Sequence, residues 1–193
     1  MEDPVLTQSQ IIAHLGRIYD RLKSACLNKK YYGEKLYRYQ QIDLWSTIVM
    51  AVGTSAAIGA WSIWHQPGGR NFWTILASVA TLASLIKPFF GFPKKIERLT
   101  RLQSGYMRLY HDLYKLVEDI RSSECVTKKM LDMFDAADTR YREFAVDDDL
   151  KKSKRLANRC EEEVRREFPN TFFWNPLLKT ARLKETKRDG LPK

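Results

Sequence analysis

Two long uncharged runs in the middle of the chain dominate its pattern of hydrophobic and polar positions. The first covers residues 44–64, LWSTIVMAVGTSAAIGAWSIW, and contains no ionisable group. As a helix it spans about 30 Å, at roughly 1.5 Å per residue, which matches the hydrocarbon thickness of a bilayer. The second run, FWTILASVATLASLI at residues 72–86, continues past Lys87 and Pro88 to Phe92. The pattern predicts two membrane spans.

The short segment between the runs, HQPGGRN at residues 65–71, predicts a turn because it contains a proline and two glycines. Aromatic residues stand at the ends of the runs, as in interfacial belts: Trp45, Trp61, Trp64, Phe72 and Trp73. The alternative is a helical hairpin buried in a soluble bundle. The first run has no amphipathic stripe, which argues against that alternative. We therefore expect a two-span transmembrane helical hairpin over residues 44–92.

The charges that flank the hairpin predict its orientation. The connector holds only Arg70, whereas cations precede and follow the hairpin: Lys29, Lys30, Lys35, Arg38, Lys87, Lys94, Lys95, Arg98 and Arg101. Positive residues stay on the cytoplasmic side, so both termini are expected there. The three cysteines, Cys26, Cys125 and Cys160, follow no disulfide spacing and fit free thiols in a reducing compartment.

The flanking segments have the periodicity of helices. Before the hairpin, Ile11, Leu15, Ile18 and Leu22 recur at three or four residues, and Ser9 is the expected N-cap. Asn28 and Gly33 weaken this pattern. After the hairpin, a heptad seam begins: Leu99, Leu102, Tyr106, Leu109, Leu113, Leu116 and Ile120. It predicts either a coiled coil that joins several subunits or packing against the N-terminal arm of the same chain.

Two more helices follow the point where Ser122 and Ser123 interrupt the seam. One carries an apolar stripe and ends at the acidic residues 147–149; the stripe is Met130, Phe134, Ala137, Tyr141 and Phe144. The other is expected over residues 150–168, before Pro169. No stretch outside the spans alternates as a strand does. The fold class is thus an all-α membrane protein, with a cytosolic helical bundle or coiled-coil region beside the hairpin.

This pattern divides the chain into four segments. We expect an N-terminal cytosolic helical arm at residues 1–43, the hairpin at 44–92, a cytosolic helical region at 93–168 and a basic tail at 169–193. Small residues four apart in the spans allow close helix packing: Gly53, Ala57, Gly59, Ala60, Ala77, Ala80 and Ser84. These positions predict that the spans associate with one another or with those of other copies.

Hydroxyl groups share one face of each span. The stripe comprises Thr47, Thr54, Ser62, Thr74, Ser78 and Thr81. Such a stripe fits the lining of a narrow wet pore; the alternative is that each hydroxyl bonds a carbonyl of its own helix and only packs. Because two helices cannot enclose a conduit, a pore requires a homo-oligomer.

Composition and charge provide little evidence for a catalytic, metal-binding or cofactor-binding site. The chain has 33 Lys and Arg against 23 Asp and Glu, a net charge of +10. His14, His65 and His111 have no metal-ligand or nucleophile partner at a useful spacing, and no glycine-rich phosphate loop is present. The acidic runs at residues 147–149 and 161–163 are flanked by cations, as solvated helix ends are. We expect neither an enzyme, nor a metal site, nor a cofactor.

The basic character of the last helix suggests binding of an anion. Its candidate ligand-binding residues are Lys151, Lys152, Lys154, Arg155 and Arg159. They would face a phosphate-bearing ligand, a nucleic acid or an anionic lipid; the alternative is a solvated helix surface diluted by residues 161–163. The three aromatics Phe172, Phe173 and Trp174 are expected to dock on the bundle or at the membrane interface.

The order of these segments resembles the SLATT family of bacterial two-span proteins. The resemblance rests on an amphipathic first helix, the segment YYGEKLYRYQ that leads into a span, a hairpin with a tiny connector and a helical tail, over residues 11–144. It implies a pore-forming effector of antiviral defence in the bacterial inner membrane. The implied partners are the lipid bilayer, other copies of the chain, and a nucleotide second messenger or a sensor protein encoded nearby. The alternative function is a membrane-anchored helical scaffold.

Overall fold

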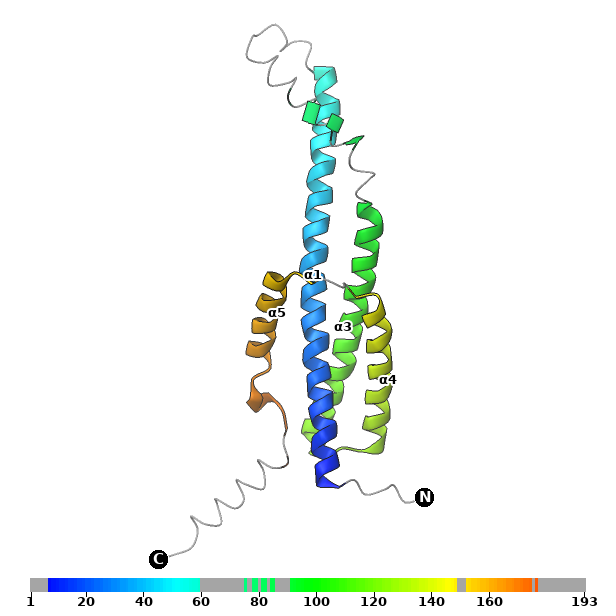
Figure 1. Cartoon of the computed structure of the whole chain (residues 1–193), viewed down its shortest axis with the longest axis vertical. Helices are drawn as coiled ribbons and strands as arrows, with labels where there is room; N and C mark the ends of the chain where they lie inside the picture. Colours follow the sequence, from blue (N-terminus) through cyan, green and yellow to red (C-terminus); the bar gives the residue numbers. More distant parts are fainter. Residues whose placement is uncertain are drawn as a thin grey trace, which may run out of the picture. The chain divides into compact units, whose positions relative to one another are not determined.

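The part of the chain that the structure describes consists of helices joined by short turns and irregular segments. The computed structural model describes residues 7–59, 75, 78–79, 81–82, 84–85, 91–148, 152–174 and 176, and for residues 53–59 and 170 only the backbone. Its helices are α1 (Gln8–Gly59), α3 (Phe92–Ser123), α4 (Lys128–Val146), α5 (Lys154–Glu167) and the short 3-10 helix η2 (Asn170–Phe172) (Figure 1). The prediction of an all-α fold is confirmed for these residues.

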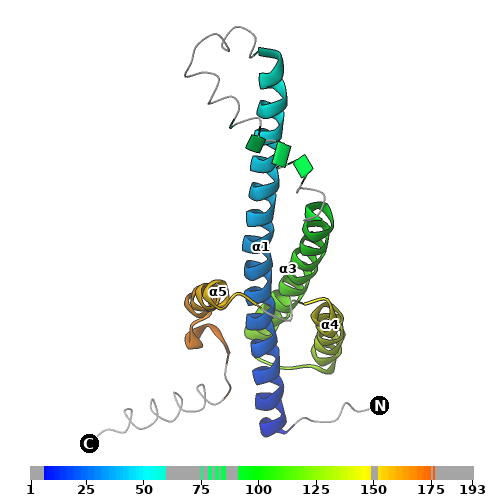
Figure 2. The ribbon, with the colours of Figure 1, turned by 45° about the horizontal axis from the view of Figure 1, so that its top comes forward.

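The chain forms two compact units, and both α1 and α3 contribute to each. The first unit combines Met1–Tyr31 with Leu102–Lys193, and the second is Tyr32–Arg101. In the first unit α3 runs antiparallel to α1, and α4 and α5 lie on opposite sides of α1 (Figures 1 and 2). In the second unit the rings of Tyr39 and Phe92 meet edge to face, with centroids 6.4 Å apart.

Helix ends follow local capping chemistry. The hydroxyl and the backbone N–H of Thr7 both donate to Gln10 Oε1 at 2.9 Å, so Thr7 precedes the first turn and the prediction of Ser9 as N-cap was wrong. Thr127 caps α4, where its hydroxyl oxygen accepts a bond from the Met130 N–H. The helix α3 ends at Ser123, whose hydroxyl donates to the Asp119 carbonyl at 2.6 Å. The predicted interruption there is confirmed.

The first helix is longer than the sequence pattern suggests. It passes through Asn28 and Gly33 without a break and continues into the uncharged run as far as Gly59. Within the described residues, none of the helices combines the length and the apolar character that a bilayer crossing needs. The predicted spans lie partly outside these residues, because residues 60–74 and most of residues 76–90 are not described.

The seam of α3 lies in the core of the single chain. All of its predicted members are buried: Leu99, Leu102, Tyr106, Leu109, Leu113, Leu116 and Ile120. The facing side of α1 buries Leu15, Ile18 and Leu22, and α4 adds Phe134 and Ala137. The structure thus places the seam where the second interpretation, packing within the chain, expects it.

A glycine allows the closest approach between α3 and α4. A Cβ atom on Gly105 would lie 2.8 Å from the Cε1 and Cζ atoms of Phe144, whose ring also packs against that of Tyr106. A Cβ atom on Gly16 of α1, by contrast, would meet no atom of another helix within 4 Å. The two helical glycines therefore differ in the space around them.

We predict that Gly105→Ala lowers the free energy of unfolding by about 1 kcal/mol, because overpacking outweighs the gain in helix propensity. Gly16→Ala should raise it by about 0.5–1 kcal/mol, since only the propensity changes there. Urea unfolding followed by circular dichroism measures both. Adding Phe144→Leu should relieve the overpacking and restore stability to the Gly105→Ala protein. Equal stabilisation by the two glycine substitutions would contradict the close approach.

Candidate functional site

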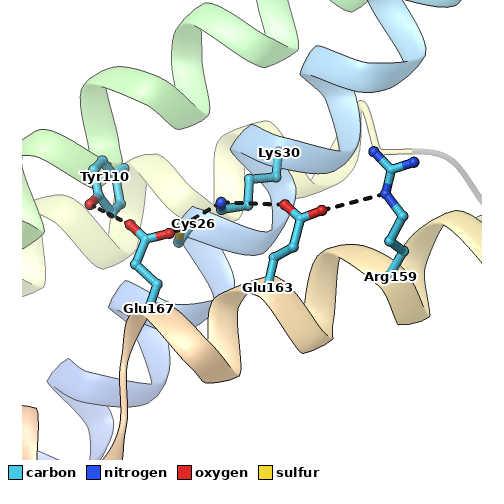
Figure 3. A network of polar contacts seen from close by, with 6 residues as sticks. All are labelled: Cys26, Lys30, Tyr110, Arg159, Glu163 and Glu167. Atoms are coloured by element: carbon cyan, nitrogen blue, oxygen red, sulfur yellow. Dashed lines mark hydrogen bonds and ion pairs between the residues drawn. The ribbon is translucent and has the colours of Figure 1, made fainter.

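Three helices meet at a cluster of polar side chains that we call the α5 junction: Cys26, Lys30, Tyr110, Glu163 and Glu167. Lys30 of α1 lies between two carboxylates of α5, with its Nζ 3.4 Å from Glu163 Oε2 and 3.2 Å from Glu167 Oε2 (Figure 3). Glu167 also accepts hydrogen bonds from the Tyr110 hydroxyl of α3 at 3.3 Å and from the Cys26 thiol at 3.8 Å. A single carboxylate thus joins α5 to both α1 and α3.

Burial and the neighbouring glutamates shift the pKa values of three groups at the α5 junction. Burial raises the pKa of the Cys26 thiol to about 11, helped by the nearby Glu167 carboxylate. It also raises the pKa of Tyr110, again with a contribution from Glu167. For Lys30 burial lowers the pKa, but the hydrogen bond and charge of Glu167 and the hydrogen bond of Glu163 raise it overall. At neutral pH the thiol and the phenol of the junction are therefore neutral, and Lys30 is a cation.

The raised pKa of Cys26 links stability to alkaline pH. Its ordinary value is 9.0, and the folded chain holds the thiol proton more tightly than the unfolded chain does. The resulting contribution to folding is present below pH 9.0 and is lost as the pH rises towards 11. At neutral pH Cys26 is therefore also a weak nucleophile, since the thiolate is the reactive form.

A second polar group fixes the start of α5. Asn28 of α1 is only 3% exposed, and its side chain accepts a bond from Lys152 Nζ at 2.8 Å and donates one to the Tyr141 hydroxyl at 3.4 Å. The Ser153 N–H donates to the Tyr31 hydroxyl at 3.0 Å. Asn28, which weakens the apolar pattern of the sequence, thus connects α1 to α4 and to the residues before α5.

A buried carboxylate connects α4 to α1. Asp138 is 4% exposed, and its Oδ1 lies 2.6 Å from Arg21 Nε of α1. Its Oδ2 accepts bonds from Arg142 of the next turn at 2.8 and 3.1 Å. The Arg21 guanidinium also lies 4.1 Å from the centre of the Tyr141 ring. Two arginines therefore compensate the buried charge, as such a charge requires.

The aromatic segment after α5 packs on the first unit, which is one of the two docking places that the sequence predicts. The rings of Phe168 and Phe173 stack with centroids 6.0 Å apart, and Phe173 lies 4.2 Å from the Tyr19 ring. The Tyr19 hydroxyl donates to the Trp174 carbonyl at 2.8 Å. Burial raises the pKa of Tyr19 to about 12, against a lowering effect of Arg121. These contacts hold the chain beyond α5 against α1.

The predicted pore-lining residues are only partly described. Ser78 and Thr81 are helical and exposed, and the Thr47 hydroxyl donates to the Asp43 carbonyl at 2.8 Å, as the packing alternative expects. Side-chain positions for Thr54, Ser62 and Thr74 lie outside the described residues. Of the helix-packing residues, Ser84 is exposed and donates to the Thr81 carbonyl, and the side chains of the others are not described: Gly53, Ala57, Gly59, Ala60, Ala77 and Ala80.

Large apolar side chains are exposed mainly in the two uncharged runs. The first run exposes Leu44, Trp45, Ile48 and Val52, and the second exposes Ile75, Val79, Leu82 and Leu85. In α4 the exposed examples are Met133 and Val146. The runs therefore carry an apolar surface that the described part of the chain does not cover.

The candidate ligand-binding cations do not form one open face. Lys152 is engaged by Asn28 and by Asp148, whose Oδ2 lies 2.8 Å from its Nζ. Arg159 pairs with Glu163 at 3.4 Å, whereas Lys154 and Arg155 are exposed, and Lys151 lies outside the described residues. The role of these residues in binding an anion stays a prediction.

The polar contacts of α4 and α5 with α1 were not predicted from the sequence, although one residue of α4 indicates such a contact. Asp138 falls in the apolar phase of α4, four residues after Phe134, where a carboxylate requires a buried partner. Glu163 and Glu167 are four apart and thus share a helix face, but nothing in their spacing identifies Lys30 as their partner. That pairing depends on the tertiary fold.

Comparisons with known proteins do not identify this site. No family model, no curated protein and no solved structure matches the chain. In the described residues, no group of three or more His, Cys, Asp or Glu side chains is placed to hold a metal ion. His14 and His111 lie on α1 and α3 outside the α5 junction.

We predict that Glu167→Gln lowers the free energy of unfolding by about 1 kcal/mol, because the ion pair with Lys30 is lost while the amide oxygen still accepts from Tyr110. This value allows for screening by solvent, since the side chains of Lys30 and Glu167 are 27% and 36% exposed. Urea unfolding monitored by circular dichroism measures the loss.

Glu162→Gln is the matched control for this substitution. Glu162 pairs at 2.8 Å with Arg166 of its own helix, and both side chains are exposed to solvent. Its replacement should change stability by less than about 0.5 kcal/mol. If the two variants were equally stable, Glu167 would not be the carboxylate that attaches α5.

Proposed function

We propose that this protein is an effector of the bacterial inner membrane, in which the uncharged hairpin inserts into the bilayer and several copies permeabilise it. The helical region of residues 93–168 would remain in the cytoplasm, and so would both termini of the chain. A nucleotide second messenger or a sensor protein would supply the trigger there. The chain itself would need neither catalytic residues nor a cofactor for this activity.

One observation supports the membrane part of the proposal above all others. The exposed apolar side chains of the two runs, such as Trp45, Ile48, Leu82 and Leu85, would each be unfavourable in water. A bilayer is a solvent in which such a surface is favourable. The first run is free of charge over a length that suits its hydrocarbon core, and the second reaches that length by continuing past Lys87. The backbone of α1 can enter this environment because its hydrogen bonds are made within the helix.

The pore part of the proposal depends on assembly. Two helices per chain cannot surround a conduit, so several copies must contribute. Among the described residues of the hydroxyl stripe, Ser78 and Thr81 are exposed and would face the conduit in this proposal. The scaffold ranks second as a candidate function, because the seam of α3, where the sequence predicts a contact between copies, is buried within the described part of the chain.

We predict that Ile48→Lys reduces the binding of the protein to lipid vesicles at least tenfold, because a lysine in the hydrocarbon region costs about 2.5 kcal/mol or more. Flotation of vesicles made of phosphatidylethanolamine and phosphatidylglycerol measures the bound fraction. Met133→Lys on α4 is the control, since Ile48 and Met133 are both 41% exposed. Met133→Lys should float as the unchanged protein does, and equal losses in both variants would contradict insertion of the first run.

Replacing residues 44–92 by an unrelated two-span anchor separates the pore from the scaffold. We predict that induced expression of the unchanged protein depolarises bacterial cells when the trigger is present, whereas the chimera stays inactive at equal abundance in the membrane. A voltage-sensitive dye measures the potential. A chimera that depolarises cells equally would support the scaffold, and unchanged potential with both proteins would exclude the pore.

A further inference from the structure

Cations outnumber carboxylates in the second unit, near the ends of the uncharged runs. Its described residues include six cations and three carboxylates: Lys35, Arg38, Lys94, Lys95, Arg98 and Arg101 against Glu34, Asp43 and Glu97. Glu97 pairs with Arg101 of its own helix at 3.7 Å. Arg38, Lys94 and Lys95 are exposed, and no described carboxylate pairs with them. We call these three side chains the basic collar.

A ring contact places the basic collar at one level of α1 and α3. Tyr39 of α1 meets Phe92 of α3 edge to face, with centroids 6.4 Å apart. Arg38 directly precedes Tyr39, and Lys94 and Lys95 follow Phe92 within three residues. Both helices therefore carry their cations within one turn of the same contact.

The basic collar lies just outside the exposed apolar surface. Arg38 is six residues before Leu44, where the uncharged run begins, which is roughly 9 Å along a helix. Beyond Leu44, α1 exposes Trp45, Ile48 and Val52. The polar region on each side of a bilayer is roughly 5–8 Å thick, and long basic side chains extend into it. With the run in the hydrocarbon, the collar is thus at the depth of the lipid phosphates.

Two exposed aromatic side chains mark the same boundary on α1. Tyr37 is 61% exposed and Trp45 is 62% exposed. Their rings combine an apolar body with a polar tip, and such side chains concentrate where lipid meets water. Tyr37 adjoins Arg38 in the sequence, so an aromatic and a basic side chain occupy the same turn.

The cations of the basic collar diverge from one another. Lys94 and Lys95 are neighbours on α3, and consecutive side chains of a helix point about 100° apart. Arg38 belongs to a different helix. A single small anion is held by polar groups that converge on it, whereas cations spread around a helix pair suit separate phosphates of a surface. Anionic lipids provide such a surface, which attracts basic residues next to a membrane segment.

We infer that the basic collar binds the phosphates of anionic phospholipids and so fixes the depth of the uncharged runs in the bilayer. The inference rests on the proposed function, because it takes these runs as the part of the chain that enters the hydrocarbon. It adds the class of lipid and the residues that recognise it. The exposed cations of α5, Lys154 and Arg155, belong to the first unit, which contains neither uncharged run.

Lys94→Gln with Lys95→Gln removes two charges of the basic collar and leaves the uncharged runs unchanged. Flotation with vesicles of phosphatidylcholine, with and without phosphatidylglycerol, gives the partition coefficient of the full-length protein for each lipid surface. The ratio of the two coefficients cancels the apolar contribution that both surfaces share. Each cation at an anionic surface contributes about fivefold (about 1 kcal/mol), so the double substitution should lower this ratio about 25-fold.

Lys128→Gln with Lys129→Gln is the matched control. These two lysines are also exposed and occupy the first turn of a helix, α4, so the net charge changes equally. Their substitution should leave the ratio unchanged, and Lys94→Arg with Lys95→Arg should do the same because it keeps both charges. Equal losses in the two glutamine variants would show that only net charge acts, and would overturn the collar.

Lipid binding by α5 gives a different result. If the ratio fell only with Lys154→Gln and Arg155→Gln, the lipid would bind at α5 and the inference would be wrong. If all variants and the unchanged protein bound both kinds of vesicle equally, no lipid class would be recognised, which would also overturn it.

Salt tests the contact in the unchanged protein, so the result does not depend on the folding of a variant. Raising the salt from about 0.1 M to about 1 M shortens the Debye length from about 10 Å to about 3 Å. The preference for phosphatidylglycerol should then fall towards unity, while binding to phosphatidylcholine persists. At equal ionic strength, free phosphate should compete no better than chloride; stronger competition would indicate a site for a soluble phosphate and would contradict the inference.

Leakage of dye from the same vesicles reports the pore independently. A preference for phosphatidylglycerol that requires Lys94 and Lys95, without leakage, keeps the collar and removes the pore. Leakage from both kinds of vesicle with equal binding to each removes the collar and keeps the pore. The two proposals therefore fail in distinguishable ways.

Discussion

The attachment of every other long helix to α1 is the constraint on which the first unit depends. Arg21 neutralises the buried Asp138 of α4, and Asn28 joins Tyr141 of α4 to Lys152 ahead of α5. Lys29 lies 3.6 Å from the ring centre of Tyr110 on α3, and Lys30 holds the carboxylates of α5. Residues 21–30, which are less than three turns of α1, therefore make polar contacts with α3, α4 and α5. Apolar burial supplies the bulk of the favourable free energy, and these polar groups select one arrangement among similar ones.

The regular features of the fold could be predicted from the sequence because they depend on local periodicity. The stripe from Phe134 to Phe144 predicted α4, and the serines at 122 and 123 marked the end of α3. The helix that the sequence predicts before Pro169 is α5. The polar connections could not be predicted in this way, since they join residues that are far apart in the sequence, such as Lys30 and Glu163, which are 133 positions apart. Asn28 illustrates the difference. Its amide interrupts the apolar pattern of α1, yet α4 and Lys152 satisfy its hydrogen bonds once the chain has folded.

The net charge of +10 overstates the number of cations that are available to an external anion, because several of them are paired within the folded chain. Several cations of the basic segments are engaged inside the chain: Arg21 and Arg142 with Asp138, Lys152 with Asp148, and Arg159 with Glu163. Such cations are less available to an external anion, because binding one would cost them an existing partner. A prediction of anion binding that is based on composition alone therefore overestimates the positive charge that α5 offers to a ligand. What remains exposed on its first turn is Lys154 and Arg155.

The proposed function depends on the continuity of α1. Lys30 receives α5 on the same helix that continues, without a proline or a break, into the uncharged run up to Gly59. An α-helix transmits a displacement along its axis because each turn is hydrogen-bonded to the next. A change of the partner bound at Lys30 would thus act on a continuous element and not through a flexible linker. In this arrangement the ligand or sensor would not need to reach the bilayer. It would only need to bind two states of the first unit with different affinity, and the free-energy difference between those states would set how strongly it must bind.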